Sequence, residues 1–460
     1  MVLRTGIPGR GGTAPGAVRS KAIEALCEVD KGRFGDDVIG STFDRIDFPN
    51  PSDYPLFTEL VMGVLRNRLL IDTILEKQVK KPLVRSDHFT VNALRVGAYQ
   101  LLFLSRVPDH AAVNETVACV KGRGSVPFVN AVLRNIQRKY SGESLETVRG
   151  REGLSVGYSV PHWLVEELGR YIPSERMESV ISCLSGKPPL HVRVNELAWE
   201  KEEVLASLKE EGVEYRDHPL VEGCITLKGG PPLARMRAFL EGMVTPQDAG
   251  SLSVAKAVAE IVIKEKGNVG RILDTCAAPG VKTSYLRQAL PSWDIVAADV
   301  SGKRLRDLRG NFRRLKATDV EIRQVDFTGE VPCELMDSFD TVFIDAPCSG
   351  LGVMRRNPEV KWRVKRGEVE RFARKAGKIV EGGISCLKRG GICFYSTCTF
   401  TETENQAVIE EVSGTIGCHL RPIEEILPGL PGELYWREYL VTPPDVLCSD
   451  FFFLAAFTRK

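Results

Sequence analysis

The chain has 460 residues, with 62 basic and 60 acidic side chains, a formal net charge of +2 and a hydrophobic fraction of 43%. This length and apolar content predict several globular domains, and no run of about 18 apolar residues is present to span a membrane. Residues 1–18 lack the apolar segment of a signal peptide, so we expect a flexible tail and a cytoplasmic protein. The twelve cysteines include no Cys-x-x-Cys pair, which argues against a zinc site.

Residues 19–142 are predicted to form an all-helical domain. Apolar side chains recur there at helical spacing. The segments concerned are 18–28, 53–79 with a break near Leu70, 90–104, 111–121 and 126–140. The segment 90–104 is apolar almost all round, so we expect it at the centre of a bundle. Residues 143–160 are polar and contain glycine, which predicts a linker.

Several stretches of this helical region are similar to the NusB-type RNA-binding domain. They are Phe57–Arg66, Asn92–Leu102, Val113–Val117 and Phe128–Arg134. The resemblance implies an RNA partner, whose phosphates basic side chains would contact without reading sequence. The candidates are Arg66, Arg68, Arg95, Arg134, Arg138 and Lys139. A solvated helix face is the alternative for each of them.

The rest of the chain predicts two α/β regions, so the fold class is multidomain, α plus α/β. Residues 155–238 form a small subdomain with helices at 161–168 and 200–211 and strands at 190–194 and 223–227. Residues 243–460 alternate strands with helices, which predicts a doubly wound parallel sheet of the Rossmann type. The strands are 271–277, 294–300, 320–326, 339–346 and 391–397, and the helices are 283–290, 301–316 and 366–388.

A ligand of such a sheet lies at the carboxyl ends of its strands. The first strand runs into a loop of mostly small residues that precedes a helix, where backbone amides can meet an anionic group. The loop residues are Cys276, Ala277, Ala278, Pro279, Gly280, Val281 and Lys282. Asp299, Asp326 and Asp345 end the next three strands. The set suits a ligand with ribose and adenine but no polyphosphate, and S-adenosylmethionine fits. An ordinary strand–helix connection is the alternative for the loop alone.

Two cysteines lie at the ends of the fourth and fifth strands, Cys348 and Cys398. Carbon-5 of cytosine becomes nucleophilic when a thiolate adds to carbon-6, so methylation there requires a thiolate facing the methyl donor. Asp345 would hydrogen-bond the base. The residues alone leave both cysteines open as the nucleophile. Neighbouring Arg355, Arg356 and Lys361 are expected to lower a thiol pKa and to hold RNA backbone.

Three motifs together resemble the Sun/RsmB family of bacterial 16S rRNA cytosine-C5 methyltransferases. They are Asp274–Lys282, Asp345–Glu359 and Tyr395–Cys398 followed by Glu404-Asn405. The resemblance implies that the loop 276–282, Asp299, Asp326 and Asp345 contact S-adenosylmethionine. It also implies that Cys398 attacks carbon-6 and that Cys348 helps release, with no metal involved. The family's target is cytosine 967 of the small-subunit rRNA.

The resemblance further implies a monomer that acts on naked or early-assembly 16S rRNA, with no DNA or membrane partner. The segment before the predicted methyltransferase domain also resembles the family, through Arg193 and Asn195. It would form one wall of an RNA channel. Two positions depart from the family pattern, namely Val281 in place of glycine and Ser449-Asp450 in place of Asp-Gly.

Basic residues crowd the helices at 303–316 and 361–378, which favours a polyanionic substrate. A base within a duplex cannot reach Cys398, so the target must be unpaired or flipped out. Other interpretations are a methyltransferase for another RNA such as tRNA, a non-catalytic RNA-binding scaffold, or a methyltransferase for a small molecule or protein. The two cysteines disfavour the last two.

Overall fold

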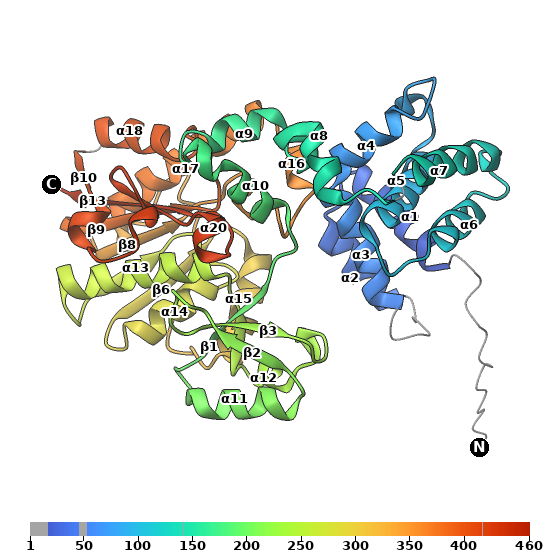
Figure 1. Ribbon diagram of the computed structural model, residues 1–460. Helices are drawn as coiled ribbons and strands as arrows, with labels where there is room; N and C mark the ends of the chain where they lie inside the picture. Colours follow the sequence, from blue (N-terminus) through green and yellow to red (C-terminus); the bar gives the residue numbers. More distant parts are fainter. Residues whose placement is uncertain (1–16, 46–52, 141, 416) are drawn as a thin grey trace, which may run out of the picture. The chain divides into compact units, whose positions relative to one another are not determined.

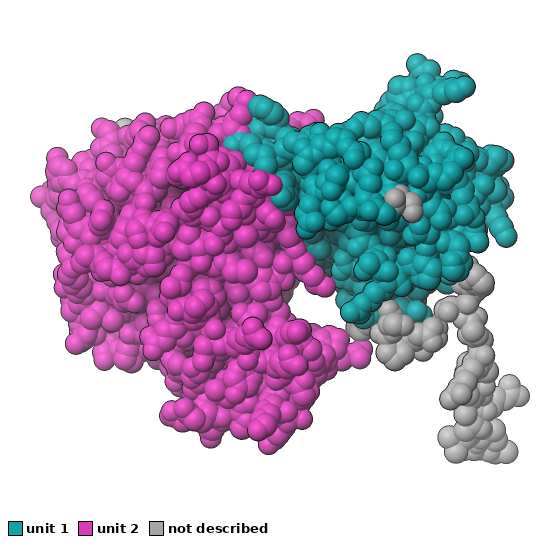
Figure 2. Space-filling model, in the orientation of Figure 1, with its two compact units in different colours: residues 1–165, 357–362 teal, residues 166–356, 363–460 magenta. Residues whose placement is uncertain are grey.

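The computed structural model (Figure 1) describes residues 17–45, 53–140, 142–415 and 417–460. The chain divides into two compact units, coloured separately in Figure 2. The helical unit comprises residues 1–165 and 357–362, and the sheet unit comprises residues 166–356 and 363–460. The tail predicted over residues 1–18 falls outside the described residues except at its end. Within the described part of the chain, none of the helices has both the length and the hydropathy that crossing a bilayer requires.

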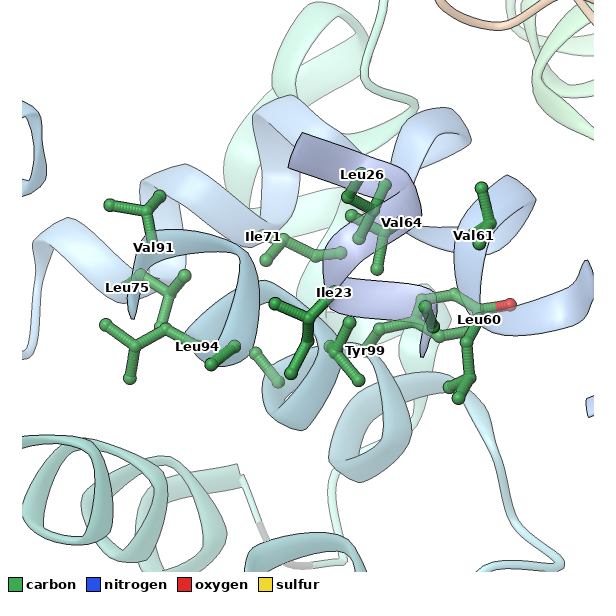
Figure 3. Close-up of a cluster of buried hydrophobic side chains, with 14 of the residues drawn as sticks. Ile23, Leu26, Leu60, Val61, Val64, Ile71, Leu75, Val91, Leu94 and Tyr99 are labelled. Carbon is green, nitrogen blue, oxygen red and sulfur yellow. The ribbon is translucent and has the colours of Figure 1, made fainter. Parts of the chain in front are cut away.

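The helical unit is a bundle around one apolar core. Its helices are α1 (Ala17–Asp30), α2 (Gly35–Arg45), α3 (Asp53–Arg66), α4 (Arg68–Glu76), η1 (Leu83–Arg85), α5 (His88–Phe103), α6 (Asp109–Cys119), α7 (Val126–Tyr140) and α8 (Leu145–Gly157). Helix α5 contacts α1, α3, α4, α6 and α7, which confirms its predicted central place. Figure 3 shows core side chains from several of these helices, among them Ile23, Leu60, Ile71, Leu94 and Tyr99.

The linker predicted over residues 143–160 is wrong, because most of it is helix α8. The helix starts at a cap in which Ser144 Oγ accepts a hydrogen bond from the amide of Thr147 at 3.1 Å. Val148 is buried and anchors the helix on the core. Gly153 lies at φ 73° and kinks the helix, which explains why the apolar period is hard to see in the sequence.

Residues 357–362 pack into the helical unit although they follow the Cys348 segment in sequence. The Glu359 carboxylate accepts a hydrogen bond from the amide of Gly35 at 2.8 Å. Lys361 Nζ donates to the carbonyl oxygen of Arg66 at 2.8 Å. Burial, together with the charge of Arg66, lowers the pKa of Lys361 to about 7. Lys361 is therefore an internal residue, and its predicted contact with RNA backbone is wrong.

The first part of the sheet unit contains a small antiparallel sheet with strand order β2-β3-β1-β4. Its strands are β1 (Leu190–Val194), β2 (Glu214–Asp217), β3 (Cys224–Lys228) and β4 (Val244–Pro246). Helices before and between them are α9 (His162–Leu168), η2 (Ser174–Arg176), α10 (Met177–Ser185), α11 (Lys201–Glu210), η3 (Leu233–Arg235) and α12 (Arg237–Leu240). Val192, Leu208 and Ile225 are fully buried between sheet and helices. The predicted strands 190–194 and 223–227 are confirmed to within one residue.

The large sheet has the strand order β11-β12-β13-β9-β8-β5-β6-β7. Five of its strands run parallel, which confirms the predicted doubly wound sheet. They are β5 (Arg271–Asp274), β6 (Asp294–Asp299), β7 (Glu321–Gln324), β8 (Phe339–Asp345) and β9 (Leu387–Thr397). The connecting helices are α13 (Ala249–Lys266), α14 (Val281–Ala289), α15 (Gly302–Arg314), η4 (Cys333–Leu335), η5 (Leu351–Val353), α16 (Val360–Arg363) and α17 (Arg366–Cys386).

An antiparallel extension on the β9 side of the sheet was not predicted. Strand β13 (Phe453–Arg459) pairs antiparallel with β9, and β10 (Cys418–Arg421) and β12 (Tyr439–Val441) both pair with β13. The remaining elements are β11 (Tyr435–Trp436), α18 (Gln406–Thr415), α19 (Ile423–Ile426), η6 (Gly432–Leu434) and α20 (Pro444–Leu447). Because β9 is covered on this side, it is buried along most of its length, and its end is held firmly in place.

Candidate functional site

The loop after β5 is shaped by one glycine and one buried carboxylate. Gly280 lies at φ 95°, and a Cβ there would come 2.6 Å from Cε1 of Phe312, so only glycine fits. The buried Asp274 accepts a hydrogen bond from Thr283 Oγ1 at 2.7 Å, which ties the strand end to the start of α14. Burial raises the pKa of Asp274 to about 7. Val281 is the first residue of α14 and needs no glycine.

Asp299, at the end of β6, keeps one acceptor atom open. Its Oδ1 accepts from the amide of Ser301 at 2.9 Å. Its Oδ2 lies 3.0 Å from Nη1 of Arg304 but accepts no hydrogen bond. Since a buried carboxylate oxygen is costly without a hydrogen-bond donor, this atom fits a ligand hydroxyl group, as the ribose of a nucleoside would supply.

One cavity joins three of the predicted donor residues, Cys276, Asp299 and Asp326. It is also lined by Thr275, Val300, Arg304, Val325, Phe327, Thr328, Pro347, Lys375 and Ile379. Asp326 is exposed, and hydrogen bonds from the side chain and amide of Thr328, at 2.7 and 2.9 Å, lower its pKa. Arg304, Lys375 and Ile379 were missed, because they reach the cavity from helices, where no strand-end pattern marks them.

Lys282, at the start of α14, and Asp345, at the end of β8, form an ion pair. Lys282 Nζ lies 2.7 Å from Oδ2 of Asp345, with both side chains largely covered. Burial lowers the pKa of Lys282, but the charge and hydrogen bond of Asp345 oppose it and leave that pKa raised. Lys282 therefore carries its charge and fixes the orientation of the carboxylate. The sequence placed both residues at the site but gave no sign that they pair.

The two predicted cysteines touch. Cys348 Sγ lies 3.3 Å from Cys398 Sγ and 3.4 Å from the Cys398 amide nitrogen. The hydrogen bond with Cys398 and burial both raise the pKa of Cys348, so Cys348 holds its proton. Cys276 is a different kind of thiol, because burial raises its pKa to about 12 and keeps it unreactive.

The segments that carry these cysteines are in direct backbone contact. The amide of Gly352 donates to the carbonyl oxygen of Cys398 at 2.9 Å, and the amide of Phe451 donates to Gly352 O at 3.0 Å. A Cβ at Gly352 would come 2.2 Å from Phe451 O and 2.8 Å from Cys398 O. Only glycine allows the two segments to approach this closely.

The arginines near Cys348 are structural, so the expectation that they hold RNA or lower a thiol pKa is wrong. Arg355 is buried and donates to the carbonyl oxygens of Cys448 and Ser449. Arg356 donates to the carboxylates of Asp450 and Asp248, both at 2.6 Å. Through these contacts Ser449 and Asp450, which depart from the family pattern, hold the segment that carries the two arginines in place. The sequence pattern could not distinguish buried arginines from exposed ones.

The basic residues of the helical unit that were predicted to contact phosphate also include buried side chains as well as more exposed ones. Arg95 is buried and makes two hydrogen bonds to Asp72, at 2.7 and 2.8 Å. Arg66 is buried as well, so for Arg66 and Arg95 the predicted role is wrong. Arg68 donates to Asp30 at 3.1 Å but is only half-buried. For Arg68, for the half-buried Arg134 and for the exposed Arg138 and Lys139 the role stays a prediction.

Comparison with known proteins agrees with this architecture. Family models match three successive segments: the NusB family over residues 17–138, a ferredoxin-like domain of RsmF/B-type methyltransferases over 160–234, and "16S rRNA methyltransferase RsmB/F" over 261–423. The crystal structure of the protein PH0851 has a TM-score of 0.76 at 23% identity, covering 98% of this chain and all of that one, and so shares the fold.

Two curated relatives are similar over most of their length, and both are named ribosomal RNA small subunit methyltransferase B. The protein from Klebsiella pneumoniae (strain 342) is 32% identical, over 85% of this chain and 88% of its own. The protein from Vibrio cholerae is 31% identical, over 90% and 94%. This chain therefore belongs to the RsmB/F family of 16S rRNA methyltransferases.

Proposed function

We propose that this protein is an S-adenosylmethionine-dependent RNA methyltransferase that methylates carbon-5 of a cytosine in small-subunit ribosomal RNA. The observation that carries the proposal is the contact of Cys348 Sγ and Cys398 Sγ at 3.3 Å, on segments that follow neighbouring strands. The ion pair of Lys282 and Asp345 lies at the same edge of the sheet. Membership of the RsmB/F family supports the reaction class.

The methyl donor would be held by the loop from Cys276 to Lys282 and by Asp299, Asp326 and Asp345. Asp299 supplies an open, buried acceptor for a ribose hydroxyl, and the turn at Gly280 brings backbone close to the ligand. Bound there, S-adenosylmethionine supplies an electrophilic methyl group on a sulfonium centre. Pro347, the residue before Cys348, lines this cavity.

Cys398 would act as the nucleophile. Its thiolate forms a bond to carbon-6 of the cytosine, and the electrons of the carbon-5 to carbon-6 double bond move towards carbon-5 and the ring. Asp345, oriented by Lys282, would hydrogen-bond the edge of the base, and the neighbouring Lys282 cation would stabilise the negative charge that develops on the ring.

Cys348 would move the proton at carbon-5 and so permit release. Removal of that proton restores the double bond, breaks the bond to Cys398 Sγ and returns its thiolate. The hydrogen bond with Cys398 is the largest cause that raises the pKa of Cys348. Once Cys398 Sγ is bonded to carbon, this cause is removed and Cys348 can lose its own proton to solvent. Its thiolate then takes the proton from carbon-5 and becomes a thiol again.

The RNA would be bound by the NusB-like helical unit and the small antiparallel sheet, and the target base would be flipped out towards Cys398. Exposed Arg138 and Lys139 on α7 are candidates for phosphate contacts. By family analogy the target is cytosine 967 of naked or early-assembly 16S rRNA, and the protein acts as a monomer in the cytoplasm without a metal.

The test is methyl transfer to defined RNAs. Purified protein is incubated with radiolabelled S-adenosylmethionine and naked 16S rRNA, assembled small subunits or tRNA, and the modified position is mapped by bisulfite sequencing. The proposal expects one 5-methylcytosine in naked 16S rRNA and none with Cys398→Ala. Methylation of tRNA alone would reassign the substrate, and no methylation of any RNA by a correctly folded protein would contradict the proposal.

A further inference from the structure

A buried glutamate, Glu404, lies between the two cysteine segments. It follows the end of β9 and precedes α18, and its side chain is only 1% exposed. Its backbone carbonyl accepts a hydrogen bond from Tyr395 Oη at 2.5 Å, which fixes the residue to β9. Nothing in the chemistry proposed above uses this carboxylate, so its position needs a reason of its own.

The carboxylate of Glu404 binds the residue that directly follows each cysteine. Oε1 accepts from the amide of Ser349 at 2.6 Å, and Oε2 accepts from Ser349 Oγ at 2.6 Å. Oε2 also accepts from Thr401 Oγ1 at 2.7 Å and from Thr399 Oγ1 at 3.2 Å. One side chain thus joins the residue after Cys348 to the residue after Cys398.

These contacts suit the ionised form of Glu404. Burial is the largest influence and leaves the pKa of Glu404 raised, although the hydrogen bonds from Ser349, Thr401 and Thr399 lower it. The carboxylate accepts all four hydrogen bonds, an arrangement that suits an ionised carboxylate. A buried charge held by neutral donors is costly, and here the four hydrogen bonds tie two separate segments to one carboxylate.

The next residue binds the same strand end from its other side. Asn405 Oδ1 accepts from Thr397 Oγ1 at 2.6 Å, and Asn405 Nδ2 donates to the carbonyl oxygen of Thr399 at 3.0 Å. The side chains of Glu404 and Asn405 therefore bind Thr397 and Thr399, the residues on both sides of Cys398. Of the two, Glu404 also binds Ser349, which follows Cys348.

We propose that Glu404 is a positioning residue that keeps Cys348 and Cys398 in contact. It would act through the two segments without touching the base. The relevance of that contact to methylation rests on the function proposed above, but the contact itself can be measured without any substrate.

The first experiment measures the contact by oxidation. Diamide, a diazene oxidant, removes one proton and one electron from each thiol; the two sulfurs join and the diazene becomes a hydrazine. Wild-type protein should form the Cys348–Cys398 disulfide rapidly, as mapped by peptide mass spectrometry. Glu404→Ala should form the disulfide at least about tenfold more slowly, because the segments that carry Cys348 and Cys398 move apart. Glu410→Gln, an exposed change on α18, is the control. Oxidation of Glu404→Ala at the wild-type rate would overturn the proposal.

The second experiment separates positioning from folding and binding. Glu404→Gln keeps the shape and one acceptor oxygen, so it should fold where Glu404→Ala fails. With 16S rRNA as substrate, kcat of Glu404→Ala should fall about a hundredfold, and Glu404→Gln should recover part of it. KM for RNA and Kd for S-adenosylhomocysteine should stay within about twofold of wild type. A loss expressed only in KM or in donor affinity would contradict positioning.

The two experiments fail in distinguishable ways. If wild-type protein methylates no RNA while the disulfide rate still depends on Glu404, the proposed function falls and the positioning role stands. If methylation occurs but neither the disulfide rate nor kcat responds to Glu404→Ala or Glu404→Gln, the positioning role falls and the proposed function stands.

Discussion

The carboxyl edge of the large sheet has a donor half, at the ends of β5, β6 and β7, and a cysteine half, at the ends of β8 and β9. The donor half is shaped mainly by local contacts: Asp274 binds Thr283 and Asp299 binds Ser301, each within one strand-to-helix turn. The cysteine half is held by residues far apart in sequence, such as Ser349 and Glu404, which are 55 positions apart.

This difference indicates how each half tolerates change. A local turn reforms with the strand and helix that flank it, so a substitution there mainly alters affinity for the donor. A set of long-range hydrogen bonds is cooperative, because each bond depends on the others being in place. We therefore expect substitutions in the cysteine half to lower the rate of methylation. Substitutions in the donor half should lower the affinity for the donor or the stability of the protein.

Among changes that leave both cysteines in place, Lys282→Met should have the largest effect, since Lys282 follows the donor loop but pairs with Asp345. The change leaves the carboxylate without its cation and free to rotate, and we expect kcat to fall about 10²- to 10³-fold. Steady-state methylation of 16S rRNA measures this. Lys303→Met, an exposed change on α15, is the control. A kcat for Lys282→Met equal to that of the control would show that the ion pair has no part in the reaction.

Asp299→Ala should act on affinity alone. Loss of a buried carboxylate acceptor is expected to weaken donor binding by about 1–3 kcal/mol, which calorimetry with S-adenosylhomocysteine would measure. The disulfide rate of Cys348 and Cys398 should stay as in wild type. Asp307→Ala, exposed on α15, provides the matched control. Unchanged affinity in Asp299→Ala would place the ribose elsewhere.

Gly280→Ala should act on stability and, through it, on donor binding. The new Cβ would lie 2.6 Å from Phe312 Cε1 at a residue with φ 95°, so we expect a loss of about 1–3 kcal/mol. Thermal unfolding with and without donor reports both effects. Gly310→Ala is the control, because nothing lies within 4 Å of its Cβ and it sits inside α15. Equal stability of the two variants would contradict the strained turn.

Asp274→Asn should change stability in a way that depends on pH. The pKa of Asp274 is raised from 3.8 to about 7 in the fold. Between these values the folded state keeps a proton that the unfolded chain has lost, so the contribution of Asp274 to stability falls as pH rises from 3.8 to 7. Asn does not titrate. The stability of Asp274→Asn relative to wild type should therefore increase between pH 5 and pH 8, and a constant difference would contradict the raised pKa.

The strand-end positions of the donor half were largely predictable, because its residues follow apolar strands at regular intervals and helices follow the strands. That these residues bind the methyl donor stays a prediction. Strand-end carboxylates such as Asp299 and Asp345 stand out in that pattern. Side-chain pairs that form across the sheet have no comparable pattern in the sequence. The bond of Glu404 to Ser349 and the ion pair of Lys282 with Asp345 depend on tertiary contacts, which no short window of sequence contains.

The errors have a common physical cause, which is that charge in a sequence does not reveal burial. Arg95, Arg356 and Lys361 were predicted to meet RNA, yet each is paired or enclosed inside the fold. The antiparallel strands after β9 were missed because β13 reads as a continuous apolar run without strand–helix alternation. Helix α8 was missed because Gly153 interrupts its period.

The central claim is that Cys398 attacks the base and Cys348 releases it, and the covalent enzyme–RNA adduct tests it most directly. Each cysteine is changed to alanine, the protein is incubated with S-adenosylmethionine and 16S rRNA, and the mixture is resolved by denaturing electrophoresis. Cys348→Ala should accumulate an adduct that survives denaturation, because attack and methyl transfer proceed while release stalls. Cys398→Ala should give neither adduct nor product. An adduct on Cys398→Ala and none on Cys348→Ala would make Cys348 the nucleophile and reverse the assignment.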